Sequence, residues 1–197
     1  MYRKFIKRSL DVLTSAVGII FLALPMLFIA IIIKVDSKGP VLFKQKRVGK
    51  GKKHFMILKF RTMRTDAPHD LPTHQLSDSK KWITRVGRFL RRTSLDELPQ
   101  LFNIFVGHMS VIGPRPALWN QLDLIAERDR YGANDVRPGL TGLAQINGRD
   151  KLRIDEKARL DGEYVEKMGF CLDVKCFFST IRSVLSSDGF VEGGTEE

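Results

Sequence analysis

The chain has 197 residues, of which 43% are hydrophobic and 28% charged, so it can build a core, which excludes a wholly disordered protein. Its two cysteines are too few for a disulfide framework. The 33 Lys and Arg residues exceed the 22 Asp and Glu residues by +11, which favours a polyanionic partner: nucleic acid, an anionic membrane surface or substrate phosphates.

The first element is an uncharged apolar run over residues 12–33, within the basic part of the chain. Residues 1–64 carry 15 Lys and Arg against 2 acidic residues, whereas residues 65–197 carry 18 against 20. As a helix, the run would extend about 33 Å, enough to cross a bilayer core of about 30 Å. Pro25 bends such a helix, and basic residues on both flanks favour a cytoplasmic location for both ends. We therefore expect a re-entrant membrane anchor over residues 1–36 with both ends on the cytoplasmic side, with a single spanning helix as the alternative.

A β-hairpin and a basic amphipathic helix are expected after the anchor. Residues 41–47 and 54–63 are β-prone and flank Gly49-Lys50-Gly51, which is typical of a turn. Residues 64–79 are polar and predict a loop. Over residues 80–92, apolar and basic side chains fall on separate helical faces. The basic face could be solvated, lie on anionic lipid or bind phosphate.

A further helix is expected to begin at Ser94. The sequence Ser94-Leu95-Asp96-Glu97 has the S-x-x-E form of a capping box. This interpretation places Asp96 and Glu97 at a helix N-terminus, where the helix dipole favours their ionised forms. The motif is also consistent with an ordinary helix cap that has no chemical role.

Two turn-rich loops and three helices are expected in the remaining chain. Residues 107–116 predict a rigid loop that holds Arg115 between two prolines, and residues 136–148 predict a loop that presents Arg137. The helices are expected over residues 121–131, 153–168 and 172–186, and a loose tail over residues 189–197. The predicted fold class is α+β and mainly helical. A catalytic domain over residues 37–188 would surround a compact core with the hairpin and amphipathic interfacial helices.

The candidate reacting groups are an acidic pair close to several cations. The chain has no P-loop, no dinucleotide fingerprint, no four-ligand Cys/His set and no D-x-D pair of the kind that holds a metal in many nucleotide-sugar transferases. Arg91 precedes Asp96 and Glu97, and arginine neutralises phosphate oxygens. A carboxylate can attack phosphorus to give an acyl phosphate, and Mg²⁺ held by carboxylates would reduce the repulsion between anions. This pattern favours phosphoryl chemistry.

Taken together and in this order, the motifs resemble those of the bacterial sugar transferases, or monotopic phosphoglycosyl transferases. The resemblance covers nearly the whole chain, whose size is similar to the minimal catalytic members, such as the diacetylbacillosamine 1-phosphate transferases. The matching segments are the opening Lys-Arg-Ser-Leu-Asp, the apolar run with its central proline, Lys59-Phe60-Arg61-Thr62-Met63, Ser94-Leu95-Asp96-Glu97-Leu98-Pro99-Gln100-Leu101, Gly113-Pro114-Arg115-Pro116, Arg137-Pro138-Gly139-Leu140-Thr141-Gly142, Asn147-Gly148-Arg149, and Leu160-Asp161 with Tyr164-Val165.

The resemblance implies an enzyme that transfers a sugar-1-phosphate from a UDP-sugar to undecaprenyl phosphate and releases UMP, the first membrane step of bacterial glycan assembly. It implies a covalent mechanism in which Asp96 is the nucleophile and Glu97 its partner in binding Mg²⁺ or in orientation. The corresponding substrate- or phosphate-binding positions are Lys59, Arg91, Arg115, Arg137 and Asp161. The implied location is the cytoplasmic face of the inner membrane, with membrane lipids as partners and no nucleic acid.

Two positions depart from common forms of the family. Leu143 stands where many members have Trp, and Gly162 stands where an apolar residue is common. Neither departure removes a proposed reacting group. The alternative functions are a membrane-associated basic binding protein without catalysis and a one-step transferase. The sequence does not identify the sugar, the glycan pathway or the oligomeric state.

Overall fold

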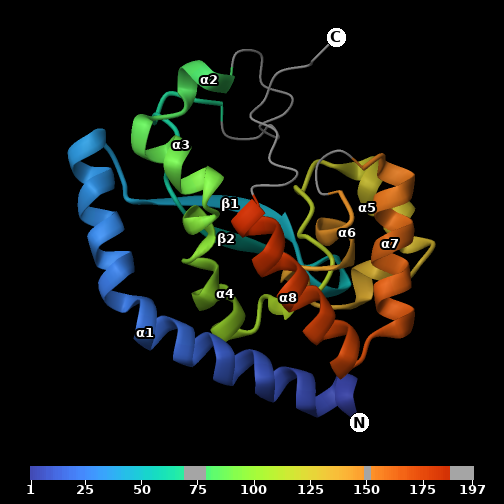
Figure 1. The fold of residues 1–197 in the computed structure, drawn as a ribbon. Helices are drawn as coiled ribbons and strands as arrows, with labels where there is room; N and C mark the ends of the chain where they lie inside the picture. The colour runs from blue at the N-terminus through green and yellow to red at the C-terminus, as the bar shows by residue number, and fades with distance from the viewer. Residues whose placement is uncertain (69–78, 149–151, 187–197) are drawn as a thin grey trace.

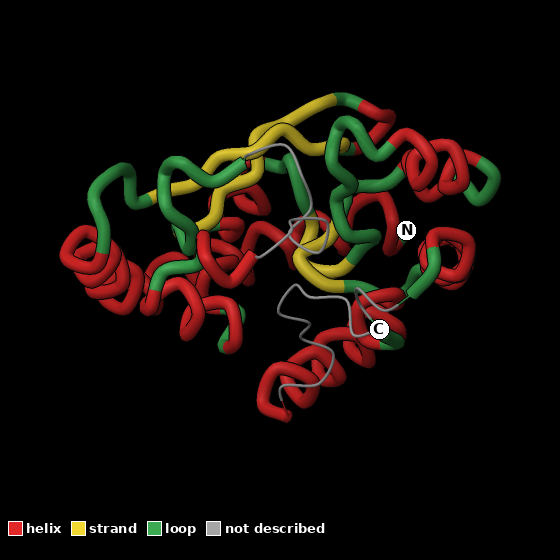
Figure 2. The backbone as a smooth tube through the Cα atoms, turned by 90° about the horizontal axis from the view of Figure 1, so that it is seen from above, coloured by secondary structure: helices red, strands yellow, loops and turns green. Residues whose placement is uncertain are grey.

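The computed structural model describes residues 1–68, 79–148 and 152–186, and confirms the mainly helical α+β class. Most of the predicted polar loop and the predicted C-terminal tail lie outside the described residues. One long helix runs along two sides of the molecule, and shorter helices surround a β-hairpin (Figure 1). Seen from above, the hairpin lies along one edge and a second, very short strand pair lies near the centre (Figure 2).

The long helix, α1, extends from Lys7 to Asp36 and follows a short π-helical turn, Tyr2–Ile6. It continues through Pro25 but is visibly bent along its length (Figure 1). Proline lacks the N–H that would complete the helical ladder, and its ring displaces the preceding turn, which accounts for a bend. By length and composition α1 is the one helix among the described residues that could cross a membrane.

The concave side of α1 packs on the protein, and its other side is apolar and exposed. Helix α4 (Gln100–Val106) and helix α3 (Arg85–Arg92) contact the concave side. Asp11 is buried there, and its Oδ1 accepts hydrogen bonds from Ser110 Oγ and the Val111 N–H, both at 2.9 Å. The exposed apolar side chains of α1 are Leu13, Val17, Ile20, Phe21, Leu24, Leu27, Phe28, Ile31 and Val35. An exposed apolar face of this extent is typical of a surface that contacts lipid or protein.

The predicted hairpin is confirmed. Strands β1 (Leu42–Val48) and β2 (His54–Phe60) pair antiparallel, with Leu42 opposite Phe60 and Val48 opposite His54. The connection is a 3-10 turn over Lys50–Lys52 in which Gly51 has a φ of +62°, a conformation that glycine adopts without steric cost. Asn103 of α4 fixes the helix on the hairpin, because its amide donates to the Met56 carbonyl and accepts from the Leu58 N–H.

The predicted single helix over residues 80–92 is wrong. The segment forms two helices, α2 (Ser79–Trp82) and α3 (Arg85–Arg92), separated by Ile83 and Thr84. Ile83 forms a β-bridge with Met63, and Thr84 Oγ1 accepts a hydrogen bond from the Gly87 N–H. A β-branched residue that pairs with a neighbouring segment, followed by a favourable N-cap, interrupts the helix even though its amphipathic pattern continues.

The predicted helix start at Ser94 is also wrong. Ser94 has a φ of +57°, its side chain caps nothing, and only a 3-10 turn over Leu95–Glu97 follows it. Its N–H donates to the Arg91 carbonyl, so Ser94 ends α3 in the left-handed conformation that commonly terminates helices. An N-cap needs an extended backbone, which is incompatible with that role. The next α-helix, α4, begins at Gln100 after Pro99.

The two loops predicted over residues 107–116 and 136–148 contain secondary structure that the sequence did not indicate. Strands β3 (Ser110–Ile112) and β4 (Gly139–Thr141) pair in parallel, and a short helix, α6 (Leu143–Ile146), follows. The two segments approach so closely that a Cβ atom on Gly139 would lie 2.1 Å from the Gly113 nitrogen. Glycine is therefore required for the two segments to meet.

The three predicted C-terminal helices are confirmed as α5 (Leu122–Asp129), α7 (Ile154–Lys167) and α8 (Phe170–Ser186). The two positions that depart from common forms of the family, Gly162 and Leu143, both contribute to packing. A Cβ on Gly162 would lie 2.4 Å from Tyr131 Cβ, so glycine lets α7 approach the segment after α5. Leu143 is buried in a core cluster with Ile112 and Tyr164.

Candidate active site

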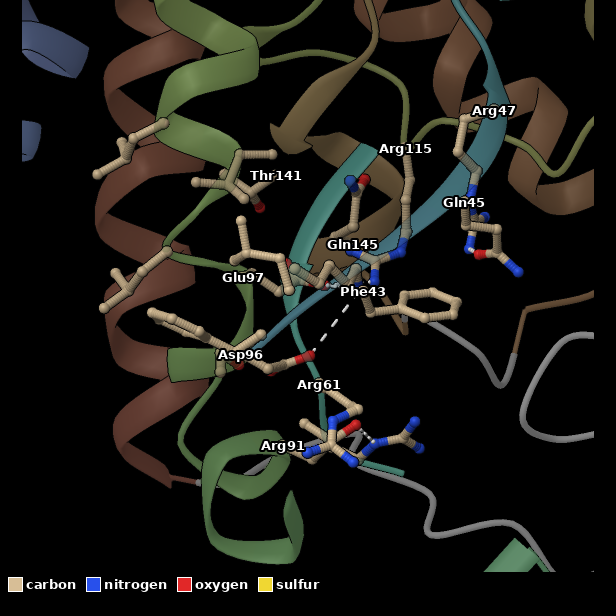
Figure 3. Close-up of a pocket in the computed structure, with 18 of the residues that line it drawn as sticks. Phe43, Gln45, Arg47, Arg61, Arg91, Asp96, Glu97, Arg115, Thr141 and Gln145 are labelled. Atoms are coloured by element: carbon tan, nitrogen blue, oxygen red, sulfur yellow. Dashed lines mark hydrogen bonds and ion pairs between the residues drawn. The ribbon is translucent and has the colours of Figure 1, made fainter. Parts of the chain in front are cut away.

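The predicted acidic pair, Asp96 and Glu97, faces a cavity of about 1080 Å³, which we call the main cavity (Figure 3). The pair lies on the 3-10 turn that connects α3 with α4. Residues from α1, both hairpin strands, α6 and α8 complete the cavity wall. The site is therefore built from segments that are distant in sequence.

Glu97 is held by two cations. Its Oε1 accepts hydrogen bonds from Lys59 Nζ and from Arg115 Nη2, each at 2.7 Å. Burial alone would raise the pKa of Glu97, but the positive charges of Arg115 and Lys59 outweigh it and hold the pKa well below its usual range. Glu97 is thus a fixed anion that positions Lys59 of β2 and Arg115 of the Gly-Pro-Arg-Pro loop.

Asp96 has a different environment from its neighbour. It is 8% exposed, and Lys59 Nζ lies 4.0 Å from its Oδ2, beyond hydrogen-bond distance. Burial raises the pKa of Asp96, and the negative charge of Glu97 adds to this, while Lys59 and Arg91 partly oppose it. A carboxylate that is desolvated and weakly paired is more reactive than one held by strong hydrogen bonds, so Asp96 is the better nucleophile of the two.

Arg91 and Arg61 lie next to the pair, and they differ in how they are used. Arg91 lines the main cavity, and its Nε donates to Thr62 Oγ1 at 2.8 Å. Arg61 is buried and donates to three backbone carbonyls, those of residues 37, 38 and 40, beyond the end of α1. Arg61 therefore fixes the connection from α1 to the hairpin, and both arginines line the main cavity.

Two of the predicted site residues do not line the main cavity. Arg137 Nε donates to the Gly107 carbonyl at 2.9 Å, which ties the start of β4 to the end of α4. Asp161 on α7 is 1% exposed and forms an ion pair with Arg128 through the Arg128 Nε and Nη2 atoms, at 2.8 and 2.5 Å. It is Arg128 that reaches the cavity wall. Lys59, Arg91, Arg115, Asp96 and Glu97 do line it together.

Sequence reasoning missed several residues of the cavity wall. Arg47 on β1, Arg128 on α5 and Lys157 on α7 bring further positive charge to it, and Gln145 on α6 contributes an amide. In the sequence, these basic residues belong to a basic strand or to ordinary helices, so no pattern marked them as site residues. Gln145 lies between two of the matching family segments, those that end at Gly142 and begin at Asn147, and it carries no charge that would have drawn attention to it.

The carboxylates of the cavity fit Mg²⁺ as a site that is shared between the protein and a substrate. Among the residues that the structure describes, no three His, Cys, Asp or Glu side chains are grouped closely enough to hold a metal. Mg²⁺ in phosphoryl-transfer sites is commonly bound through one or two carboxylates, with substrate phosphates and water as the other ligands. Asp96 and Glu97 supply two carboxylates of this kind, so the pair fits the ion.

A second, apolar hollow adjoins the main cavity. This apolar groove has a volume of about 580 Å³ and lies between α1 and α3. Leu22 and Leu98 line both the groove and the main cavity, so the two are adjacent. Pro25 at the bend of α1 lines the groove as well. The remaining lining residues are Phe28, Ile29, Ile32, Arg85, Val86, Phe89, Leu90 and Leu95.

Comparisons with known proteins agree with the resemblance noted from the motifs. The family model described as bacterial sugar transferase matches residues 2–187. The chain is 40% identical over 195 residues to an undecaprenyl-phosphate glucose phosphotransferase of Komagataeibacter xylinus, covering 93% of this chain and 37% of the relative. It is 42% identical over 193 residues to the exopolysaccharide production protein PSS of Rhizobium leguminosarum bv. phaseoli, covering 92% and 96% respectively.

A third relative carries a different sugar in its name. The chain is 39% identical over 196 residues to a UDP-N-acetylgalactosamine-undecaprenyl-phosphate N-acetylgalactosaminephosphotransferase of Aeromonas hydrophila, covering 94% of this chain and 45% of the relative. The chain thus spans less than half the length of some relatives and nearly all of another. The protein belongs to the bacterial sugar transferase family.

Proposed function

We propose that the protein transfers a sugar-1-phosphate from a UDP-sugar to undecaprenyl phosphate and releases UMP. The observation that carries this proposal is the unequal carboxylate pair in a basic cavity that adjoins an apolar groove. The cations suit a diphosphate, and the groove suits the hydrocarbon chain of a lipid acceptor. Names of relatives that combine undecaprenyl phosphate with UDP-sugars support the same reaction.

In the first proposed step, an Asp96 carboxylate oxygen attacks the β-phosphorus of the donor. A bond forms between that oxygen and phosphorus, and the bond from phosphorus to the bridging oxygen breaks, so the electron pair leaves with UMP. In the second step, a phosphate oxygen of the acceptor attacks the same phosphorus, and the acyl-phosphate bond breaks. Asp96 returns as a carboxylate, and the product is a diphosphate-linked sugar.

The neighbouring residues have separate roles in this proposal. Arg115 and Lys59, both oriented by Glu97, neutralise the donor diphosphate, and Arg91 faces the incoming acceptor phosphate. Asp96 and Glu97 would also hold Mg²⁺, which supplies further charge neutralisation when it is bound. The arrangement lets two anions approach each other because nearby positive charges neutralise part of their repulsion.

We further propose that α1 is a re-entrant anchor and that the catalytic residues lie at the cytoplasmic face of the inner membrane. The exposed apolar face of α1 and its bend at Pro25 support this arrangement. The basic flanks favour a cytoplasmic location for both ends. Cysteines placed at the exposed positions Phe5 and Lys46, with Cys171 replaced by Ser, should both label from the cytoplasmic side. Labelling from opposite sides would contradict the re-entrant anchor.

The proposed reaction is tested by replacing the nucleophile. The Asp96→Asn enzyme should release no UMP and form no sugar-phosphate adduct detectable by intact-protein mass spectrometry, whereas Asp155→Asn, a change at an exposed carboxylate on α7, should behave as wild type. Full turnover by Asp96→Asn would sink the assignment and favour a binding protein or another mechanism. Exchange of labelled UMP into UDP-sugar without acceptor would exclude a one-step transfer.

A further inference from the structure

The side chain of Gln145 is buried in the wall of the main cavity without a partner. It is 7% exposed, and neither its Nε2 nor its Oε1 atom makes a hydrogen bond. Figure 3 shows Gln145 next to Arg115, with Gln45 and Arg47 of β1 nearby. A buried amide without a partner destabilises a fold, and a ligand that completes its hydrogen bonds would offset that cost.

Close backbone contacts hold Gln145 and Arg115 in a fixed relationship. Gln145 lies on α6, whose N-cap is Gly142, and a Cβ on Gly142 would lie 2.1 Å from the Gly113 carbonyl oxygen. Gly113 begins the Gly-Pro-Arg-Pro loop that carries Arg115, and its N–H donates to the Thr141 carbonyl at 2.8 Å. The amide and the guanidinium are therefore presented by one rigid unit, as a binding site requires.

The position of Gln145 indicates which part of a donor it would meet. Arg115 contacts Glu97 of the acidic pair, and Gln145 lies beside Arg115, so the amide is separated from the reacting carboxylates by a phosphate-binding group. Arg128, Lys157 and the ring of Phe43 also line the cavity. A nucleoside diphosphate with its phosphates on Arg115 extends beyond them through its ribose to its base.

We propose that Gln145 binds the nucleobase of the donor, a pyrimidine that presents an N–H donor next to a carbonyl acceptor. The amide Oε1 would accept from the N3–H group of uracil, and Nε2 would donate to an adjacent carbonyl. This inference rests on the proposed function, because it assumes a UDP-sugar donor. It assigns a specificity role to a residue outside the phosphate-binding set.

The test compares UMP with N3-methyl-UMP, which lacks the N–H group, by calorimetric titration of the full chain in detergent micelles. Wild type should bind UMP at least about tenfold more tightly than the methylated nucleotide, since removing a partner of a buried polar group carries a penalty of that order. In Gln145→Leu this preference should disappear. Gln121→Leu is the matched control, because it makes the same change outside the cavity wall, and it should keep the preference.

Three results would overturn the inference: equal binding of both nucleotides by wild type, an undiminished preference in Gln145→Leu, or no UMP binding by an enzyme that turns over. The wild-type comparison remains decisive if the Gln145→Leu variant does not fold. Failure of the proposed function is recognised separately, because it requires turnover by Asp96→Asn or an absence of UMP release. An enzyme that releases UMP and depends on Asp96 but does not discriminate through Gln145 overturns the base contact alone.

Discussion

Replacing Asp161 by Asn tests whether this residue acts in the fold or in the chemistry. The Asp161 side chain is 1% exposed and that of its partner Arg128 is 4% exposed. Asn conserves the size of the side chain but leaves the Arg128 guanidinium buried without a counter-charge. Breaking a buried ion pair in this way costs about 3–5 kcal/mol. For a chain of this length each kcal/mol lowers the melting temperature by about 2–4 °C, so we expect a decrease of roughly 6–20 °C.

The measurement is thermal unfolding in detergent micelles, with turnover recorded on the same samples. Glu163→Gln is the matched control on the same helix, because its ion pair with Lys167 is exposed, with 63% and 36% side-chain exposure for the lysine and the glutamate. Exposed pairs of this kind contribute about 0.3–0.5 kcal/mol, which corresponds to a shift of no more than about 2 °C. An Asp161→Asn protein that melts like wild type but has lost turnover would refute the structural role and favour a direct part in catalysis.

Three further predictions concern the backbone, the anchor and the acidic pair. Gly142→Ala should lower stability by about 1–3 kcal/mol, because its Cβ would overlap a backbone oxygen, whereas Gly169→Ala, with its nearest contact at 3.7 Å, should melt within about 2 °C of wild type. Pro25→Ala should straighten α1 and abolish same-side labelling of cysteines at the two ends of the anchor, and unchanged labelling would count against the bend. Glu97→Gln should move the acidic limb of the pH–rate profile to lower pH, because it removes the negative charge that raises the pKa of Asp96; a limb that stays or moves upward would contradict this coupling.

Elements specified by local sequence were predicted well. The hairpin was found because Gly49-Lys50-Gly51 separates two β-prone segments, and Gly51 adopts the positive φ that such turns use. Helices α5, α7 and α8 were found from their periodicity and length. In each case the signal and the structure extend over the same few residues, so no knowledge of distant neighbours was needed.

Elements specified by distant neighbours were missed or misplaced. The pairing of β3 with β4 joins Ser110 to Gly139, and strands of three residues are too short to show an alternating pattern. Ser94 has the sequence of an N-cap, but it ends the preceding helix instead, and one residue cannot hold both backbone conformations. The helical pattern is interrupted at Thr84 because the Thr84 N–H donates to the carbonyl of Thr62, which lies far back in the chain.

The same distinction applies to the site. Asp96 and Glu97 were identified through the family resemblance, and the structure adds that they differ, because Lys59 contacts Glu97 across 38 residues of sequence. The unsatisfied amide of Gln145 could not be predicted, since burial of a neutral side chain leaves no trace in a sequence pattern. The resemblance supplied the candidate positions, whereas the contacts that distinguish them came from the fold.

The contrast within the acidic pair explains how adjacent carboxylates can have different tasks. Two cations at 2.7 Å hold Glu97 ionised and lower its pKa, while burial raises the pKa of Asp96. Neighbouring titratable groups whose pKa values are driven apart are a common way to divide roles in an active site. Glu97 uses its charge to orient Lys59 and Arg115. Burial makes Asp96 costly to ionise. In the proposed first step this cost decreases, because the Asp96 oxygen loses its negative charge when it bonds to the β-phosphorus. In the proposed mechanism, the residue that forms the intermediate is therefore the one whose ionised form the site stabilises less than that of its neighbour.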